Sequence, residues 1–235
     1  MNLHDDHQYS ILQRVIDGTL AVDSVEEFEE ILRIYPEDPL LQRKYADLLM
    51  HKSLLDEAQA AFQKACGLFI EEQMNLQAIV AKILQWSIQK PNHEAGQQFH
   101  KLLSQKGARH TPLQRFWPNM TYGELVALML RLVRVKLSTG QKIAWVDEPA
   151  NDICFVVSGT LAETISPDCQ FEASKAGLDT EPMLLGPNDI IGNIFPLDQP
   201  TRSYTDVVAV NEVELVKIAK PVLFDTCRKY PNIET

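Results

Sequence analysis

The stretch Leu184–Arg202 reads LLGPNDIIGNIFPLDQPTR and decides how the rest of the chain is interpreted. Its apolar start runs into a Pro-Asn turn and then meets Gly192, and a single arginine closes it. Free backbone amides at a helix start, with one guanidinium nearby, form a pocket for one phosphate. The stretch therefore predicts either a phosphate-binding loop or a loop of that shape that has lost its ligand.

The residues on both sides of this stretch have the period of β-strands. Val133, Val135 and Leu137 alternate with basic residues, and Gly140 marks the end of that strand. Short strands separated by turn signals about every ten residues predict a sandwich or barrel. The further strands are expected at 143–146, 153–157, 161–165, 183–185, 205–210 and 213–218, with a closing helix from 221. The fold expected for this half is a β jelly roll flanked by helices.

The order of these motifs resembles that of a known family. Asp152-Ile-Cys-Phe-Val-Val-Ser-Gly159 is followed by Leu185-Gly-Pro-Asn-Asp-Ile-Ile-Gly-Asn193 and then by an arginine. Over residues 113–235 this is similar to the cyclic-nucleotide-binding domain of bacterial catabolite-activator-type regulators, kinase regulatory subunits and gated channels. The resemblance implies a phosphate-binding cassette in which a glycine and helix amides hold the cyclic phosphate. It also implies an acidic residue on the ribose hydroxyl, an arginine on the phosphate, and cyclic AMP or cyclic GMP as ligand.

Carried over to this chain, the family pattern matches in part. Gly192 stands at the family glycine and Arg202 at the arginine, but Asn193 replaces the acidic residue. An amide in that place forfeits a charge-assisted hydrogen bond worth roughly 1–3 kcal/mol. A proline in the cassette helix and one extra residue after the arginine also depart from the pattern. The candidate ligand-binding residues are Gly192, Asn193, Ile194, Arg202, Ser203 and Tyr204.

An alternative remains for the same residues. The cassette could keep its fold and bind no cyclic nucleotide, with Arg202 paired to Asp198 or Asp206 instead. The chain would then be a structural scaffold for protein–protein contacts. Both interpretations make the protein a regulatory or interaction module.

Helical periodicity governs the first half of the chain. Ala46 lies on one predicted helix, and Ala58, Phe62 and Ala65 lie on the next, the small-and-large register of a tetratricopeptide repeat. One 34-residue period back from Phe62 falls on Phe28. Residues 1–110 thus resemble a short, degenerate tetratricopeptide-like array, and an unrelated helical bundle is the alternative. Such arrays present a surface to a protein partner or to a second copy of themselves.

These two halves predict an α+β protein of two domains. A polar segment from Gly107 to Pro112 separates them, so the boundaries are 1–110 for the helical tetratricopeptide-like domain and 111–235 for the β domain. At 235 residues, the chain is long enough for each domain to bury its own core.

Composition narrows the classes of function. The net charge of −10 argues against a nucleic-acid partner, because phosphate backbones require clustered Lys and Arg. The apolar runs are too short for a membrane span, and the acidic N-terminus is unlike a signal peptide. Four widely spaced cysteines fit a reducing cytoplasm and predict no metal site. With no nucleophile–base spacing or Walker-type loop, we expect a regulatory signal-transduction module, not an enzyme, and no cofactor besides the nucleotide ligand.

Overall fold

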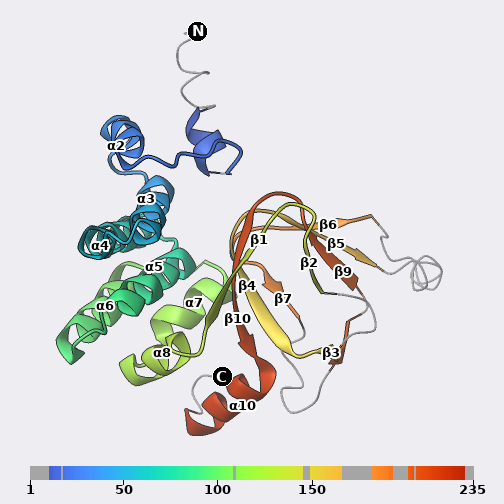
Figure 1. Ribbon diagram of the computed structural model, residues 1–235. Coiled ribbons are helices and arrows are strands. Elements are labelled where there is room, and N and C mark those ends of the chain that lie inside the picture. The colour runs from blue at the N-terminus through green and yellow to red at the C-terminus, as the bar shows by residue number, and fades with distance from the viewer. Residues whose placement is uncertain are drawn as a thin grey trace. The chain divides into compact units, whose positions relative to one another are not determined.

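The computed structural model describes residues 11–16, 18–107, 110–144, 149–165, 181–192, 201–203 and 205–230. The chain divides into two compact units, Met1–Val126 and Ala127–Thr235. Helices make up the first unit, and the second consists of antiparallel sheets with a closing helix (Figure 1). The predicted combination of helices with antiparallel sheet is confirmed.

Capping side chains start most of the helices. Ser24 accepts a hydrogen bond from the Glu27 amide, and Asp38 and Asn92 cap their helices in the same way. These contacts satisfy backbone amides that have no partner within the helix. The helices are α2 (Val25–Ile34), α3 (Pro39–His51), α4 (Leu55–Glu71), α5 (Asn75–Ile88), α6 (His93–Lys106), α7 (Pro112–Asn119) and α8 (Tyr122–Met129).

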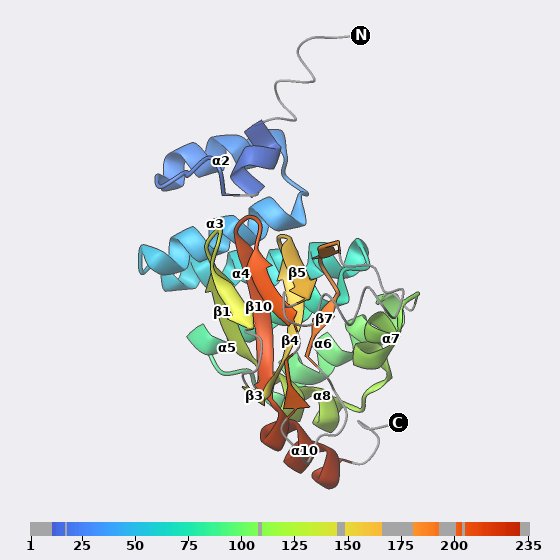
Figure 2. The ribbon, with the colours of Figure 1, turned by 90° about the vertical axis from the view of Figure 1, so that its right-hand side faces the viewer.

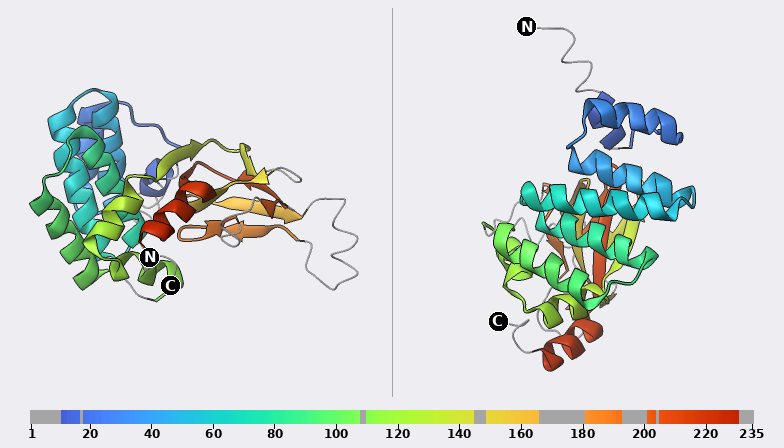
Figure 3. Two further views of the ribbon diagram at one scale, coloured as in Figure 1. Left: turned by 90° about the horizontal axis from the view of Figure 1, so that it is seen from below. Right: turned by 90° about the vertical axis from the view of Figure 1, so that its left-hand side faces the viewer.

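Helix α4 packs side by side with both α3 and α5 (Figure 3, right), and α2 contacts α3. Ala46, Ala58, Phe62 and Ala65 are fully buried at these contacts. Small side chains allow the helix axes to approach, and the phenylalanine ring fills the remaining space. An unrelated bundle would bury such residues too, so the tetratricopeptide-like assignment stays a prediction.

Helix α7 belongs to the helical unit. It packs on α5 and α6, Trp117 is fully buried, and the Asn75 side chain donates a 2.9 Å hydrogen bond to the Gln114 carbonyl oxygen. The division between the units accordingly falls within α8, later in the chain than the boundary at residue 110 predicted from the sequence. The polar segment before Pro112 is a connection inside the first unit.

Two four-stranded sheets form the second unit, with strand orders β1-β10-β4-β7 and β2-β9-β5-β6 (Figures 1 and 2). The pairings are all antiparallel, and a separate ribbon joins β3 to β8. The strands are β1 (Val133–Leu137), β2 (Lys142–Ala144), β3 (Pro149–Ala150), β4 (Asp152–Ser158), β5 (Leu161–Ile165), β6 (Met183–Leu185), β7 (Ile190–Ile191), β8 (Thr201–Arg202), β9 (Thr205–Ala209) and β10 (Val213–Ala219).

One apolar core serves both sheets. Cys154 and Val156 come from one sheet, Leu161 and Val207 from the other, and all four are buried in the same cluster. Ile191 of β7 joins this cluster. Helix α10 (Lys220–Lys229) follows β10 directly and packs on it. The Leu184–Arg202 stretch therefore includes a strand, β7, that is fixed in the core.

Candidate phosphate-binding site

Gly192 stands at the end of β7, where the chain leaves the core. Its φ angle is +101°, in the region that favours glycine, and a β-carbon there would lie 2.7 Å from the Asp152 carbonyl oxygen. The neighbouring pairs Cys154–Ile191 and Phe155–Ile190 hold β7 against β4. Only glycine fits this position without a shift of the backbone. The positive φ angle and the close approach of Asp152 are the structural reasons for a glycine at residue 192.

Arg202 lies in β8, at the other end of the same loop. Its backbone is paired with Pro149, and Thr201 is paired with Ala150. The structure describes the backbone of Arg202, and this places the arginine on the short ribbon that leads into β4. Ile191 and Thr201, the paired residues on either side of this part of the sequence, are thus both held by strand pairing.

The two ends of the loop are held by one short piece of chain. Gly192 contacts Asp152, and Arg202 is paired with Pro149, three residues earlier. Consecutive Cα atoms are 3.8 Å apart, so these two anchor residues are at most about 11 Å from each other. Paired strands add about 5 Å on each side. The glycine and the arginine are therefore brought to the same end of the β unit although ten positions separate them.

Of the other predicted site residues, the structure describes Ser203. Its hydroxyl donates a 2.8 Å hydrogen bond to the Thr205 carbonyl oxygen and accepts a 3.4 Å bond from the Thr205 amide. With its proton on a backbone carbonyl, the hydroxyl shapes the turn into β9 and does not donate to a ligand in this arrangement. Asn193, Ile194 and Tyr204 lie outside the described residues, as does Asp198.

Asp206, one of the two acids considered as an internal partner for Arg202, has a basic partner of its own. Its carboxylate accepts a 2.8 Å bond from the Lys142 ammonium across the pair β2–β9. This ion pair is partly exposed, and both side chains come from adjacent strands.

Charge next to Gly192 is balanced by a pair that sequence reasoning did not identify. The Lys217 ammonium donates to the Asp152 carboxylate over 2.5 Å, and this hydrogen bond raises the pKa of Lys217. The pKa of the adjacent Cys154 thiol is raised to about 12, mainly because the thiol is buried and secondly because the Asp152 carboxylate is negatively charged. The thiol is therefore uncharged at neutral pH. Neutralising Asp152 removes a negative charge that would be unfavourable beside the candidate anion site. The pairing of β4 with β10 creates this contact between residues far apart in the chain, so it could not be predicted from the local sequence.

The described ranges hold neither a candidate metal centre nor a candidate membrane span. Within them, no group of three or more His, Cys, Asp or Glu side chains is placed to hold a metal ion. None of the helices in the same ranges combines the length and the apolarity needed to cross a membrane.

Comparisons with known proteins give likeness of fold only. No protein-family model matches the chain, and no curated protein matches it. Similar solved structures include the C-linker/CNBHD of zELK channels, crystallised in the presence of cAMP. That match has 19% identity and a TM-score of 0.43, and it covers 59% of this chain and 65%, less than two thirds, of that structure.

Two further structures have the same degree of likeness. The Thermus thermophilus catabolite activator protein is 19% identical with a TM-score of 0.40, over 51% of this chain and 52% of that one. The cyclic-nucleotide binding homology domain of a KCNH channel is 19% identical with a TM-score of 0.41, over 54% and 85%. At these values the likeness carries no argument about function, which has to come from the geometry of this chain.

Proposed function

We propose that the β unit is a regulatory module that binds cyclic AMP, cyclic GMP or a related phosphate ligand in the loop between Gly192 and Arg202. The supporting observation is that one four-residue stretch, from Pro149 to Asp152, holds both ends of this loop. A phosphate needs backbone amides and a guanidinium at one place, and a loop anchored at both ends can offer them with little loss of entropy on binding.

Each residue has a distinct role in this proposal. The glycine permits the close turn that exposes the following amides, and the Arg202 guanidinium neutralises the phosphate. The Asn193 side chain would bond the ribose hydroxyl as a neutral group. Because that bond lacks charge assistance, we expect weaker binding than an acidic residue would give. Ligand binding would be coupled to protein contacts made by the tetratricopeptide-like helices, with a partner protein or a second copy.

Calorimetry with cyclic AMP, cyclic GMP and a cyclic dinucleotide tests this function directly. We expect one of them to bind, and Arg202→Ala to weaken it by about 10- to 100-fold, the value of a charge-assisted hydrogen bond. Arg228→Ala is a matched control, because Arg228 lies on α10 over the Phe224 ring. Absence of heat with every nucleotide, at protein concentrations of about 100 μM, would exclude cyclic-nucleotide binding of useful affinity.

A scaffold function is the second candidate, and one observation favours it. Strand β6 is at the edge of its sheet, and its Met183 and Leu184 are 55% and 65% exposed. An apolar edge strand is suited to pairing with another chain. Sedimentation of wild type and Leu184→Lys distinguishes the candidates: a protein that binds no nucleotide and self-associates only when Leu184 is present is a scaffold.

A further inference from the structure

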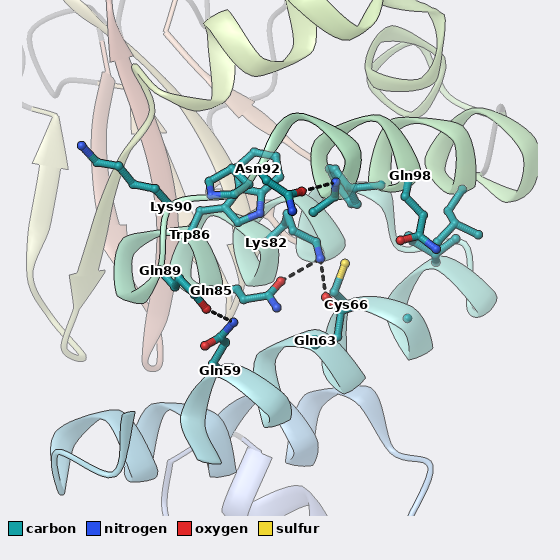
Figure 4. A pocket seen from close by; sticks show the side chains of 16 residues that line it. Gln59, Gln63, Cys66, Lys82, Gln85, Trp86, Gln89, Lys90, Asn92 and Gln98 are labelled. Atoms are coloured by element: carbon teal, nitrogen blue, oxygen red, sulfur yellow. Dashed lines mark hydrogen bonds between the residues drawn. The ribbon is translucent and has the colours of Figure 1, made fainter. Parts of the chain in front are cut away.

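A pocket of about 390 Å³ lies between helices α4, α5 and α6 of the helical unit. Its polar side chains are mainly amides (Figure 4). Trp86, Phe99 and Leu102 contribute apolar walls. This volume is in the range of sites that take small organic molecules. The pocket is independent of the phosphate-binding loop, since every lining residue is in the first unit.

Lys82 is the buried cation of this pocket, with 5% of its surface exposed. Its ammonium donates to the Gln63 and Gln85 carbonyl oxygens over 2.6 and 2.7 Å and lies 5.3 Å from the centre of the Phe99 ring. Within the part of the chain that the structure describes, no carboxylate pairs with it. Burying an ammonium without a counter-charge is costly, and burial accordingly lowers the pKa of Lys82.

The amides around Lys82 turn this pocket into a cluster of donors. An ammonium can only donate, so the oxygen of each glutamine faces Lys82 and the NH₂ group of each is left to bond elsewhere. The NH₂ group of Asn92 also remains as a donor, because the Asn92 side-chain oxygen accepts a hydrogen bond from the Ala95 amide at the start of α6. One ammonium proton and several amide NH₂ groups together suit an acceptor that carries a negative charge.

The net charge and the walls of the pocket define the ligand further. Lys90, the other basic lining residue, extends away from Lys82 (Figure 4). A single positive charge is best balanced by a single negative one, and the aromatic walls favour an apolar body. We propose that this pocket binds a small organic monocarboxylate, with its carboxylate on Lys82 and the glutamine amides and its apolar part against Trp86.

A substitution at Gly67 can block the pocket and leave the charge of Lys82 unchanged. Gly67 lines the pocket, and a β-carbon at this position would meet no atom within 4 Å. A leucine there would project into open space and take up part of the pocket. Gly123 on α8 also has nothing within 4 Å and is not a lining residue, so Gly123→Leu is the matched control.

The test uses three acids, benzoate, hexanoate and 4-phenylbutyrate, each beside its uncharged primary amide. Binding to the full chain is followed by the NMR signal of the Trp86 indole, assigned with Trp86→Phe. We expect at least one acid to bind about tenfold or more tightly than its amide. Lys82→Met should remove this preference, Gly67→Leu should abolish binding of acid and amide alike, and Gly123→Leu should leave both unchanged.

Three results would overturn the proposal. No shift of the Trp86 signal with any acid at about 10 mM would show that the pocket has no such affinity. Equal binding of acid and amide would show that the charge is not recognised. A preference that persists in Lys82→Met would place the recognition elsewhere. Each variant is first checked for the circular dichroism and unfolding transition of the folded protein, and Lys82→Gln repeats the test with a polar replacement.

Discussion

The carbonyl oxygen of Asp152 lies 2.7 Å from the point that a β-carbon on Gly192 would occupy. This contact fixes the start of the candidate cassette to β4 and requires glycine at the position. The same region of backbone, three residues earlier, is paired with Arg202. The glycine and the arginine of the loop are thus linked through one short stretch of chain, Pro149–Asp152, which runs from β3 into β4.

Replacing Gly192 by alanine should destabilise the β unit and remove nucleotide binding. A positive φ costs alanine about 1–2 kcal/mol, and the contact with Asp152 adds to this, so we expect a total of about 2–4 kcal/mol. Urea unfolding measures the change. Gly140→Ala is the control. Gly140 has a φ of +81° but open space around its β-carbon position, so this variant should lose only the roughly 1–2 kcal/mol that the positive φ costs. Equal losses in the two variants would contradict the close approach.

The ion pair between Lys217 and Asp152 should contribute little free energy of unfolding. Each side chain is 36% exposed, and exposed pairs are worth less than about 1 kcal/mol. A double-mutant cycle with Lys217→Met and Asp152→Asn measures the coupling, which should shrink in about 1 M salt. A larger coupling that salt does not change would show that the pair is effectively buried.

The same pair gives a signed pH dependence. The folded protein holds the pKa of Lys217 above its ordinary value, so the contribution of the pair is fully present below that value, 10.5. It is lost as the pH rises through the higher pKa of the folded state. The difference in unfolding free energy between wild type and Lys217→Met should therefore narrow above about pH 10.5.

Lys82 should show the opposite dependence. Burial lowers its pKa in the folded protein, so the unfolded chain binds more protons between that pKa and 10.5. The cost of the buried charge is present at neutral pH and decreases as the pH rises through this window. Lys82→Met should hence be at least as stable as wild type at pH 7, and its advantage should shrink toward pH 10. If Lys82→Met were strongly destabilised at pH 7, the conclusion that the Lys82 ammonium is buried without a compensating charge would be wrong.

The thiols of Cys66 and Cys154 should be unreactive in the folded protein. Burial raises the pKa of Cys66 to about 11 and that of Cys154 to about 12, and both are almost fully covered. Cys169 lies outside the described residues and is replaced by serine so that it does not contribute to the signal. The folded Cys169→Ser protein should react with Ellman's reagent at pH 8 far more slowly than the same protein unfolded in guanidinium. Rapid reaction of a folded Cys66→Ser/Cys169→Ser protein, but not of Cys154→Ser/Cys169→Ser, would contradict the burial of Cys154.

Much of the local structure could be predicted from the sequence, because it depends on neighbouring residues. The alternation of Val133, Val135 and Leu137 predicted β1, and the apolar run after Asp152 predicted β4. The short strands β3, β7 and β8 were missed, since two-residue strands have no period and exist only through their partners.

The sequence by itself determined that this chain has a helical part and an antiparallel β part, and that Gly192 and Arg202 are the residues to examine. Hydrophobic period and turn residues are enough for that. Only the tertiary structure decided that Pro149–Asp152 anchors both ends of the loop, that Asp152 is neutralised by Lys217, and that Lys82 is buried among amides. These depend on strand pairing and helix packing between residues far apart in the chain, and local sequence carries no record of such contacts.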